Sequence, residues 1–404
     1  MRPSMPDSIG GKPHQHPPDF SLAVGGPFFR LLRRAHLYDD AMLLVRQRVI
    51  VFSLFAWLPL LLLSMLQGQL LGGEVAAPFL LDVEVHVRFL VAMPLLIGSE
   101  LLVHQRMRYV VRQFLERNLV PDNAMPRFDG AIASASRLRN STLAEALLIA
   151  LVYGVGVLIV WRHYVALDAA TWYAIPSAGG AKLSLAGMWY GYVSLPMFQF
   201  LLVRWYYRLF IWARLLWQVS RIQLDLVPTH PDRFGGLGFL STTVNALILI
   251  GIAHGALVAG NIADQIFVLE KTLPEFAGEI AIMVVFVQCV VLAPLLVFAP
   301  QLVAARWKGL FEYGTLSMRY VREFDTKWLR GGLPADEALV GSNDIQSLAD
   351  LDTSYQIVQT MHLVPVAWKA SLLLGLATLT PIAPLLLTMM PIEELLEKLF
   401  SMLF

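Results

Sequence analysis

Long apolar stretches alternate with charged stretches along the chain, and this pattern predicts helices that cross a membrane. About 20 helical residues, at 1.5 Å per residue, cross the hydrocarbon core of a bilayer. Seven apolar stretches meet this requirement. They cover residues 49–71, 87–103, 143–161, 185–203, 239–262, 280–303 and 363–390. The pattern therefore predicts an all-α fold, a polytopic transmembrane bundle of about seven spans.

The basic residues between these spans set the expected orientation. With a cytoplasmic N-terminus, the inside segments hold 7, 7, 5 and 6 Lys and Arg residues, and the outside segments hold 1, 2, 1 and 1. Cytoplasmic loops of membrane proteins carry such an excess of Lys and Arg. We therefore expect the N-terminus in the cytoplasm and the C-terminus in the periplasm of a bacterial inner membrane.

The polar stretches divide the chain further. Residues 1–27 are rich in proline and poor in apolar side chains, so we expect a disordered cytoplasmic tail. Residues 28–303 form the bundle of spans 1 to 6 with helical cytoplasmic loops. We expect a cytoplasmic helical segment over 304–362, and the last span with a periplasmic amphipathic tail over 363–404.

Within the cytoplasmic segment, apolar side chains between residues 344 and 361 recur at steps of three and four, which is typical of a helix with one apolar stripe. We expect this stripe to pack on another part of the same chain. The alternatives are a subunit interface and a surface for a protein partner.

Composition agrees with a membrane protein and narrows the chemistry. The chain is 57% hydrophobic and 15% charged, against about 45–50% and 25% in soluble domains. A net charge of +1 argues against nucleic-acid binding, which needs a basic face. Cys289 is the single cysteine, so an internal disulfide and a cysteine zinc site are excluded. We expect no metal and no cofactor, and membrane lipids as partners.

Ionisable groups inside the predicted spans are the first functional candidates. A charge at the centre of a bilayer costs at least about 2.5–3.5 kcal/mol, and such groups usually face the bundle interior or a water-filled path. Lys369, Glu100, Glu145 and His254 lie within the predicted spans, and we expect them along a polar path. The alternatives are a lysine that reaches back to the membrane surface and a histidine packed between helices.

A glycine-rich loop before the fifth span is the second candidate. Glycines permit positive φ, and free N–H groups at a helix start can hold an anion. The loop also offers an imidazole, a carboxylate and a guanidinium within four residues. The candidates for a ligand or gating loop are His230, Asp232, Arg233, Gly235 and Gly236. The alternative is a rigid elbow that redirects the chain at the membrane surface.

Three stretches carry a family resemblance. They are Thr229-His230-Pro231-Asp232 with Gly235-Gly236-Leu237-Gly238-Phe239-Leu240, then Asp344-Ile345-Gln346-Ser347-Leu348-Ala349-Asp350-Leu351, and Met390-Pro391-Ile392-Glu393-Glu394-Leu395-Leu396. With these motifs the chain resembles a family of bacterial polytopic inner-membrane proteins that has no assigned activity. The resemblance implies a location in the bacterial inner membrane, and it transfers no functional residue.

The sequence contains no zinc-protease, nucleophile-elbow or phosphate-loop motif. Buried ionisable groups and proline-interrupted spans favour a channel or transporter for a small ion or solute, expected as a homo-oligomer. One alternative is a membrane enzyme that acts on a lipid or lipid-linked group at the inner interface. Another is a non-catalytic scaffold or sensor that docks a partner through residues 344–361.

Overall fold

The computed structural model describes residues 20–35, 44–72, 75, 78–161, 171–175, 182–332 and 342–389. The chain is all-α, as the apolar pattern predicts. In the described part, strands are limited to one short antiparallel pair, β1 (Ala174–Ile175) with β2 (Lys182–Leu183). The predicted tail at residues 1–19 and the predicted amphipathic helix after Pro391 lie outside the described residues.

Five helical runs of the described residues are long and apolar enough to cross a membrane. Some are continuous through short 3-10 or π-helical turns. They are α2 (Val45–Leu66); α3 (Val83–Val87), η2 (Arg88–Ala92) and α4 (Met93–Glu116); η6 (Gly238–Ser241), α10 (Thr242–Ala246) and α11 (Ile248–Leu269); η7 (Leu273–Phe276), α12 (Ala277–Leu292), η8 (Ala293–Phe298), α13 (Ala299–Phe324) and η9 (Asp325–Leu329); and α15 (Trp368–Leu379) with η10 (Thr380–Thr388).

A sixth candidate is a bent pair of helices. One arm consists of η3 (Asp122–Ala124) and α5 (Met125–Arg139), and the other of α6 (Thr142–Leu151) and η4 (Val152–Trp161). The two arms meet at 47°. The protein is therefore an integral membrane protein with several spans. The predicted span at residues 185–203 is helical, as α8 (Leu185–Trp189), η5 (Tyr190–Ser194) and α9 (Leu195–Val219), but it is not among these candidates.

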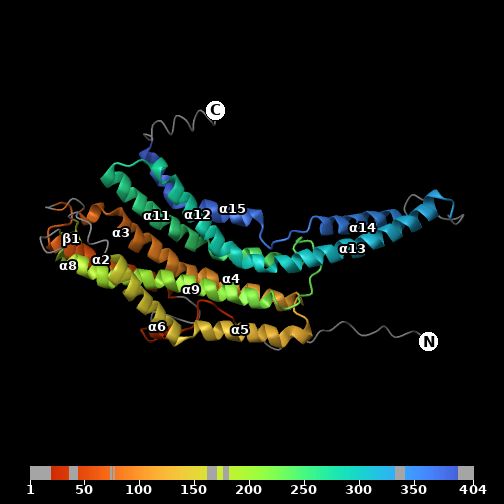
Figure 1. The fold of residues 1–404 in the computed structure, drawn as a ribbon, viewed down its shortest axis with the longest axis horizontal. Helices are drawn as coiled ribbons and strands as arrows, with labels where there is room; N and C mark the ends of the chain where they lie inside the picture. Colours follow the sequence, from red (N-terminus) through yellow and green to blue (C-terminus); the bar gives the residue numbers. More distant parts are fainter. Residues whose placement is uncertain are drawn as a thin grey trace.

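The helices lie side by side along the long axis of the molecule (Figure 1). Helices α4 and α9 run next to each other through the centre, and α13 extends past the bundle at one end together with α14 (Asn343–Gln359). The short strands, α3 and α8 gather at the opposite end. The molecule thus has two distinct ends, and the connections between successive long helices alternate between them.

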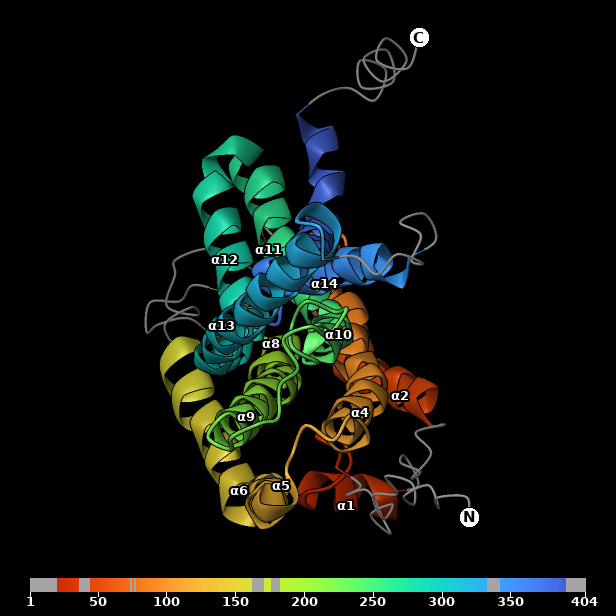
Figure 2. The same cartoon turned by 90° about the vertical axis from the view of Figure 1, so that its right-hand side faces the viewer.

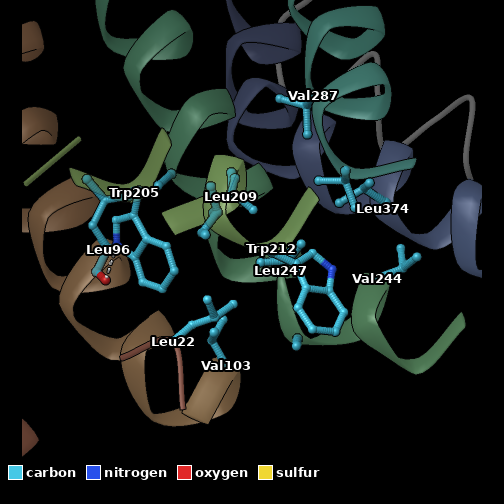
Figure 3. Packing of buried hydrophobic residues seen from close by; sticks show 14 of the residues in the cluster. Leu22, Leu96, Val103, Trp205, Leu209, Trp212, Val244, Leu247, Val287 and Leu374 are labelled. Atoms are coloured by element: carbon cyan, nitrogen blue, oxygen red, sulfur yellow. Dashed lines mark hydrogen bonds between the residues drawn. The ribbon is translucent and has the colours of Figure 1, made fainter. Parts of the chain in front are cut away.

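The core between these helices is apolar and aromatic. Trp205 and Trp212 of α9 are buried next to Leu96 of α4 and Leu247 (Figure 3). The indole Nε1 of Trp205 donates to the carbonyl oxygen of Leu96 at 2.9 Å. A buried indole needs such a partner, since an unpaired polar group in hydrocarbon is costly.

The N-terminal segment differs from the sequence expectation. Proline content predicts a disordered tail up to residue 27, yet Phe20 and Leu22 are at most 2% exposed within the main core. Leu22 lies beside Val103 (Figure 3). The prediction is wrong for these residues because a few apolar side chains are enough to fill a gap between helices, whatever the composition around them. Helix α1 (Pro27–Arg34) follows, with Gly26 at its N-cap.

The last span begins later than predicted. The chain from residue 363 to 367 is not helical, and α15 starts at Trp368. Pro365 explains the delay, because proline disfavours a helical conformation at the residue before it and lacks a donor N–H. Lys369, expected two turns into the span, therefore lies in its first turn and is exposed.

Candidate functional site

The most concentrated chemistry in the described residues is a buried arginine–glutamate cluster, consisting of Arg48, Glu100, Glu145, Arg204 and Arg208. All five side chains belong to residues that are at most 8% exposed. Arg48 donates to Oε2 of Glu100, while Nη1 of Arg208 lies 2.8 Å from Oε1 of the same carboxylate. Arg204 lies between the two glutamates, 3.8 Å from Glu100 and 3.7 Å from Glu145.

The cluster joins four helices. Arg48 comes from α2, Glu100 from α4, Glu145 from α6, and the other two arginines from α9. Taking a charge out of water costs several kcal/mol, and close pairing with hydrogen bonds compensates for that cost. The cluster therefore fixes the relative position of these helices, and it brings together Glu100 and Glu145, two of the four predicted path residues.

The arginines of the cluster also stack on aromatic rings. The guanidinium of Arg204 lies 4.7 Å from the ring centre of Phe28, and that of Arg208 lies 4.9 Å from the ring centre of Trp205. Arg208 donates in addition to the carbonyl oxygen of Ala23 at 3.2 Å. The N-terminal segment is thus held by the cluster as well as by its apolar residues.

Glu145 positions helix α1. The backbone N–H of Phe28 donates to Oε2 of Glu145 at 2.6 Å. A carboxylate at a helix start is favourable because the first N–H groups have no partner in the helix and the dipole end is positive. Gly26 allows this close approach, since a Cβ there would lie 3.0 Å from Oε1 of Glu145, and its φ is 97°.

An apolar cleft opens beside Glu145. It has a volume of about 560 Å³, and Glu145 is the one charged residue among the described residues that line it. The walls come from α1, from α6 with η4, and from η5 with α9. They include Phe28, Leu31, Ile149, Tyr153, Met197 and Phe200. The hydroxyl of Tyr153 donates to the carbonyl oxygen of Tyr192 at 3.3 Å, which connects two of the walls.

His254 lies apart from this cluster, in the second turn of α11. Its Nδ1 is 2.7 Å from the carbonyl oxygen of Ile250, and its Nε2 is 2.6 Å from the hydroxyl of Tyr206. A carbonyl can only accept, so Nδ1 carries a proton and Nε2 of the neutral ring accepts from Tyr206. Both ring nitrogens are engaged, which agrees with the packed histidine that the sequence left as an alternative.

Lys369 does not join the two glutamates. It is exposed at the start of α15, and the ion pairs of Glu100 and Glu145 in the described residues are formed with arginines. The sequence pattern does not single out these arginines, because they look like ordinary basic residues of the cytoplasmic loops. The available signal was that Arg48 and Arg204 directly adjoin the predicted spans 49–71 and 185–203.

The glycine-rich loop folds around one carboxylate. Oδ1 of Asp232 accepts from the backbone N–H groups of Phe234 at 2.8 Å and Gly236 at 3.2 Å, and Oδ2 accepts from Gly238 at 2.9 Å. These N–H groups form the anion-binding concavity that the glycine pattern predicts. The anion in it is the chain's own aspartate.

Backbone conformation explains the glycines. Gly235 has a φ of 62° and Gly236 a φ of 98°, which side chains with a Cβ rarely adopt. Arg233 shares this conformation with a φ of 58°. Arg117 at the end of α4 completes the loop, because its Nη1 donates to the carbonyl oxygen of Gly236 at 2.9 Å and lies 3.5 Å from Asp232.

The loop is connected to the segment between α14 and α15. The backbone N–H of His362 donates to the carbonyl oxygen of Arg233 at 2.8 Å, and the His362 ring stacks on Phe234 with 4.9 Å between ring centres. His230 lies 3.0 Å from Asp232 through its Nδ1. The imidazole of His230, the carboxylate of Asp232 and the backbone of Arg233 therefore contact the protein itself, as the rigid-elbow alternative expects, while the side chain of Arg233 is exposed.

In the described residues, no group of three or more His, Cys, Asp or Glu side chains could hold a metal ion. No family model, no curated protein and no solved structure matches the chain. The fold and the site thus define a class, an all-α membrane protein of several spans. Within this class, the most specific feature is the pairing of a buried charge cluster with an apolar cleft.

Proposed function

We propose that the chain crosses a bacterial inner membrane seven times, with a cytoplasmic N-terminus, and binds an amphiphile of the inner leaflet in the cleft beside Glu145. The topology is supported by the distribution of Lys and Arg and by the placement of α9. This helix runs parallel to α4 through the centre of the bundle (Figure 1), as a seventh span would.

The observation that carries the binding proposal is the cleft. Its walls include Ile149 and Tyr153 on one proposed span and Met197 and Phe200 on another, so the proposed topology puts the cleft within the membrane. A pocket of about 300–1,000 Å³ with apolar walls and few polar groups is typical of ligand sites. The apolar chain of a lipid matches the walls, and its polar end matches the charged side chains of α1.

Binding without catalysis agrees with the remaining geometry. Asp232 is bonded to its own loop, and His254 is paired on both nitrogens, so neither is poised as an acid or base. A receptor or scaffold that responds to lipid is therefore favoured over a lipid-modifying enzyme.

The transport hypothesis has no specific observation in its favour. Among the described residues, Lys369 and His254 are not connected to the buried cluster. The predicted homo-oligomer stays a prediction. The partner site on residues 344–361 also stays a prediction, although Tyr355 and Val358 of the stripe contact α13 and Val358 is fully buried.

Filling the cleft tests the proposal. Ile149 lines the cleft and is 48% exposed, so Ile149→Trp narrows the cleft without entering the core. The purified chain is titrated with phospholipid in mild detergent, and the bound lipid is counted by native mass spectrometry. We expect several-fold less bound lipid for the variant, because the indole takes the space of the acyl chain.

The matched control is Leu147→Trp. Leu147 lies on the same helix and is 60% exposed, but it does not line the cleft. The Leu147→Trp variant should bind as much lipid as the unaltered chain. Equal lipid retention by all three proteins would overturn the proposal.

A further inference from the structure

The cleft alone cannot select one lipid from another. Lipid tails are as apolar as leucine, so moving an acyl chain from the bilayer into an apolar cleft adds little free energy. Selectivity therefore has to come from polar groups at the mouth of the cleft. Helix α1 provides these groups, and its sequence decides their sign.

Helix α1 presents its charges next to the cleft. Pro27 and Leu31 line the cleft, and Arg30 and Arg34 follow each of them by three residues. Residues three and four apart are neighbours on a helix surface, so Arg30 adjoins Pro27 and Arg34 adjoins Leu31 at the edge of the cleft-lining face. Both arginines are exposed, and no carboxylate lies within α1.

The helix is held in an orientation that suits the membrane surface. Phe29 and Leu32 are buried at 7% and 6% exposure, and the N-terminus is fixed by Glu145. Figure 2 shows α1 from the side while α5 is seen end-on, so α1 lies across the direction of the bundle. A basic amphipathic helix across the membrane normal places its arginines at the level of lipid headgroups.

Glu145, the charged residue that lines the cleft, does not attract a ligand of either charge. Oε2 of Glu145 accepts the N–H of Phe28, and Oε1 faces Arg204 at 3.7 Å. Its charge is therefore compensated inside the protein. The charge that a bound headgroup meets is that of Arg30 and Arg34.

From this arrangement we infer that the ligand of the cleft is an anionic phospholipid, whose headgroup phosphate binds Arg30 and Arg34 while one acyl chain occupies the cleft. The inference rests on the proposed binding function and adds the class of the ligand. An arginine near the membrane surface contributes on the order of fivefold in affinity for anionic lipid. Two arginines give a preference on the order of 25-fold before screening by salt.

A competition experiment tests the inference. The full chain in mild detergent is mixed with equal amounts of phosphatidylglycerol and phosphatidylcholine of the same chain length, and the bound lipids are counted by native mass spectrometry. We expect an excess of bound phosphatidylglycerol of at least about fivefold. In the double variant Arg30→Gln, Arg34→Gln we expect this excess to vanish while the total amount of bound lipid is maintained.

Two controls separate the sources of the effect. The double variant Arg319→Gln, Arg322→Gln removes two exposed arginines of the cytoplasmic helix α13 and should keep the preference. Inorganic phosphate at the concentration of the lipid should not displace phosphatidylglycerol, because it lacks the chain that fills the cleft. Displacement by phosphate would assign the arginines to a free anion and overturn the inference.

The remaining outcomes distinguish the two proposals. Equal binding of both lipids by the unaltered chain, or a preference that survives in the Arg30 and Arg34 variant, overturns the inference and leaves the cleft as a general lipid site. Absence of bound lipid in the unaltered chain overturns the proposed function itself. Loss of both lipids in the arginine variant also contradicts the inference, since the arginines would then act on the fold.

Discussion

Buried arginines decide what the glutamates of this protein do. Glu100 is buried and lies beside three guanidinium groups from other helices, so its charge holds helices together. A carboxylate in such a place is a structural group, because moving a proton onto it would leave the arginines without their counter-charge. The same reasoning separates Glu100 from an exposed charge such as Lys369.

The substitution Glu100→Gln tests this role. It leaves Arg48 and Arg208 buried beside a neutral amide, and breaking a buried pair in this way costs about 3–5 kcal/mol. We expect a clearly lower midpoint of thermal unfolding in detergent. Glu312→Gln is the control, since Glu312 is 59% exposed and its pair with Lys308 spans 3.8 Å. A midpoint equal for both variants would contradict a structural role of Glu100.

At the scale of elements, the pair α13–α14 has one especially close contact. Gly309 of α13 packs against both the glycine-rich loop (residues 227–239) and α14. A Cβ at Gly309 would lie 2.6 Å from Cβ of Pro228 in this loop and 2.9 Å from Cγ1 of Val358 in α14. Gly314, farther along α13, faces Tyr355 at an ordinary 3.7 Å. The loop, α13 and α14 therefore form one packed unit around Gly309.

We predict opposite effects for alanine at these two glycines. Gly309→Ala forces the backbone of α13 away from Pro228 and Val358, at a cost of about 1–3 kcal/mol for overpacking. Gly314→Ala has space and gains about 0.8–1 kcal/mol of helix propensity. Hydrogen exchange of the α14 amides measures both effects. Compared with the unaltered chain, we expect faster exchange in Gly309→Ala and equal or slower exchange in Gly314→Ala. Slower exchange in Gly309→Ala would show that the contact is not tight.

The N-terminal end of α14 makes a contact that depends on pH. Lys327 donates to Asp344 at 2.7 Å and Trp328 donates to it at 3.1 Å, and the hydrogen bond from Lys327 is the main reason that the pKa of Asp344 lies below its usual value. A lowered pKa means that the contact is complete above about pH 4, the ordinary value, and is lost as the pH falls through the lowered one.

Hydrogen exchange at the start of α14 should follow this titration. We expect protection to be constant from about pH 7 to about pH 4 and to decrease below that range, after correction for the intrinsic pH dependence of exchange. In Asp344→Asn this decrease should be absent. The control is Asp352, an exposed residue of the same helix, whose substitution by Asn should leave the decrease in place.

The whole molecule is organised by its two ends. The run from Leu273 to Leu329 has 57 residues, which is about 85 Å at 1.5 Å per residue and far more than the hydrocarbon thickness. Its far part, α13, therefore extends into the aqueous phase with α14 at its side (Figure 1). The strand end of the bundle lies on the opposite side of the membrane in the proposed topology.

Labelling of single cysteines tests this topology. In a chain with Cys289→Ser, we predict that Lys182→Cys and Lys271→Cys react with a membrane-impermeant maleimide added to spheroplasts. Asp350→Cys should react only after lysis. All three positions are exposed. Reaction of Lys271→Cys only after lysis, with Lys182→Cys still reactive in spheroplasts, would remove Leu185–Val219 from the spans and reverse the orientation of every later span.

The sequence predicted the helices well because a span depends on local composition. Apolar runs of about 20 residues have one stable solution in lipid, a helix with internally paired backbone groups. The predicted boundaries were less accurate at two places. Pro365 delays the start of the last helix, and the ordered part of the chain begins earlier than predicted because Phe20 is buried. Both errors involve contacts or conformations that hydropathy does not encode.

For the candidate site, the sequence by itself determined that Glu100 and Glu145 fall in apolar stretches and that the loop at residues 227–239 can turn tightly. Only the tertiary structure decided their partners. Arg48, Arg204 and Arg208 come from helices distant in sequence, and their approach to Glu100 depends on how α2, α4 and α9 pack. The hydropathy of a segment is the sum of the contributions of its own residues, so the sequence alone is enough to predict it. Pairing and cleft formation depend on three-dimensional proximity, which the chain reaches only when the helices assemble.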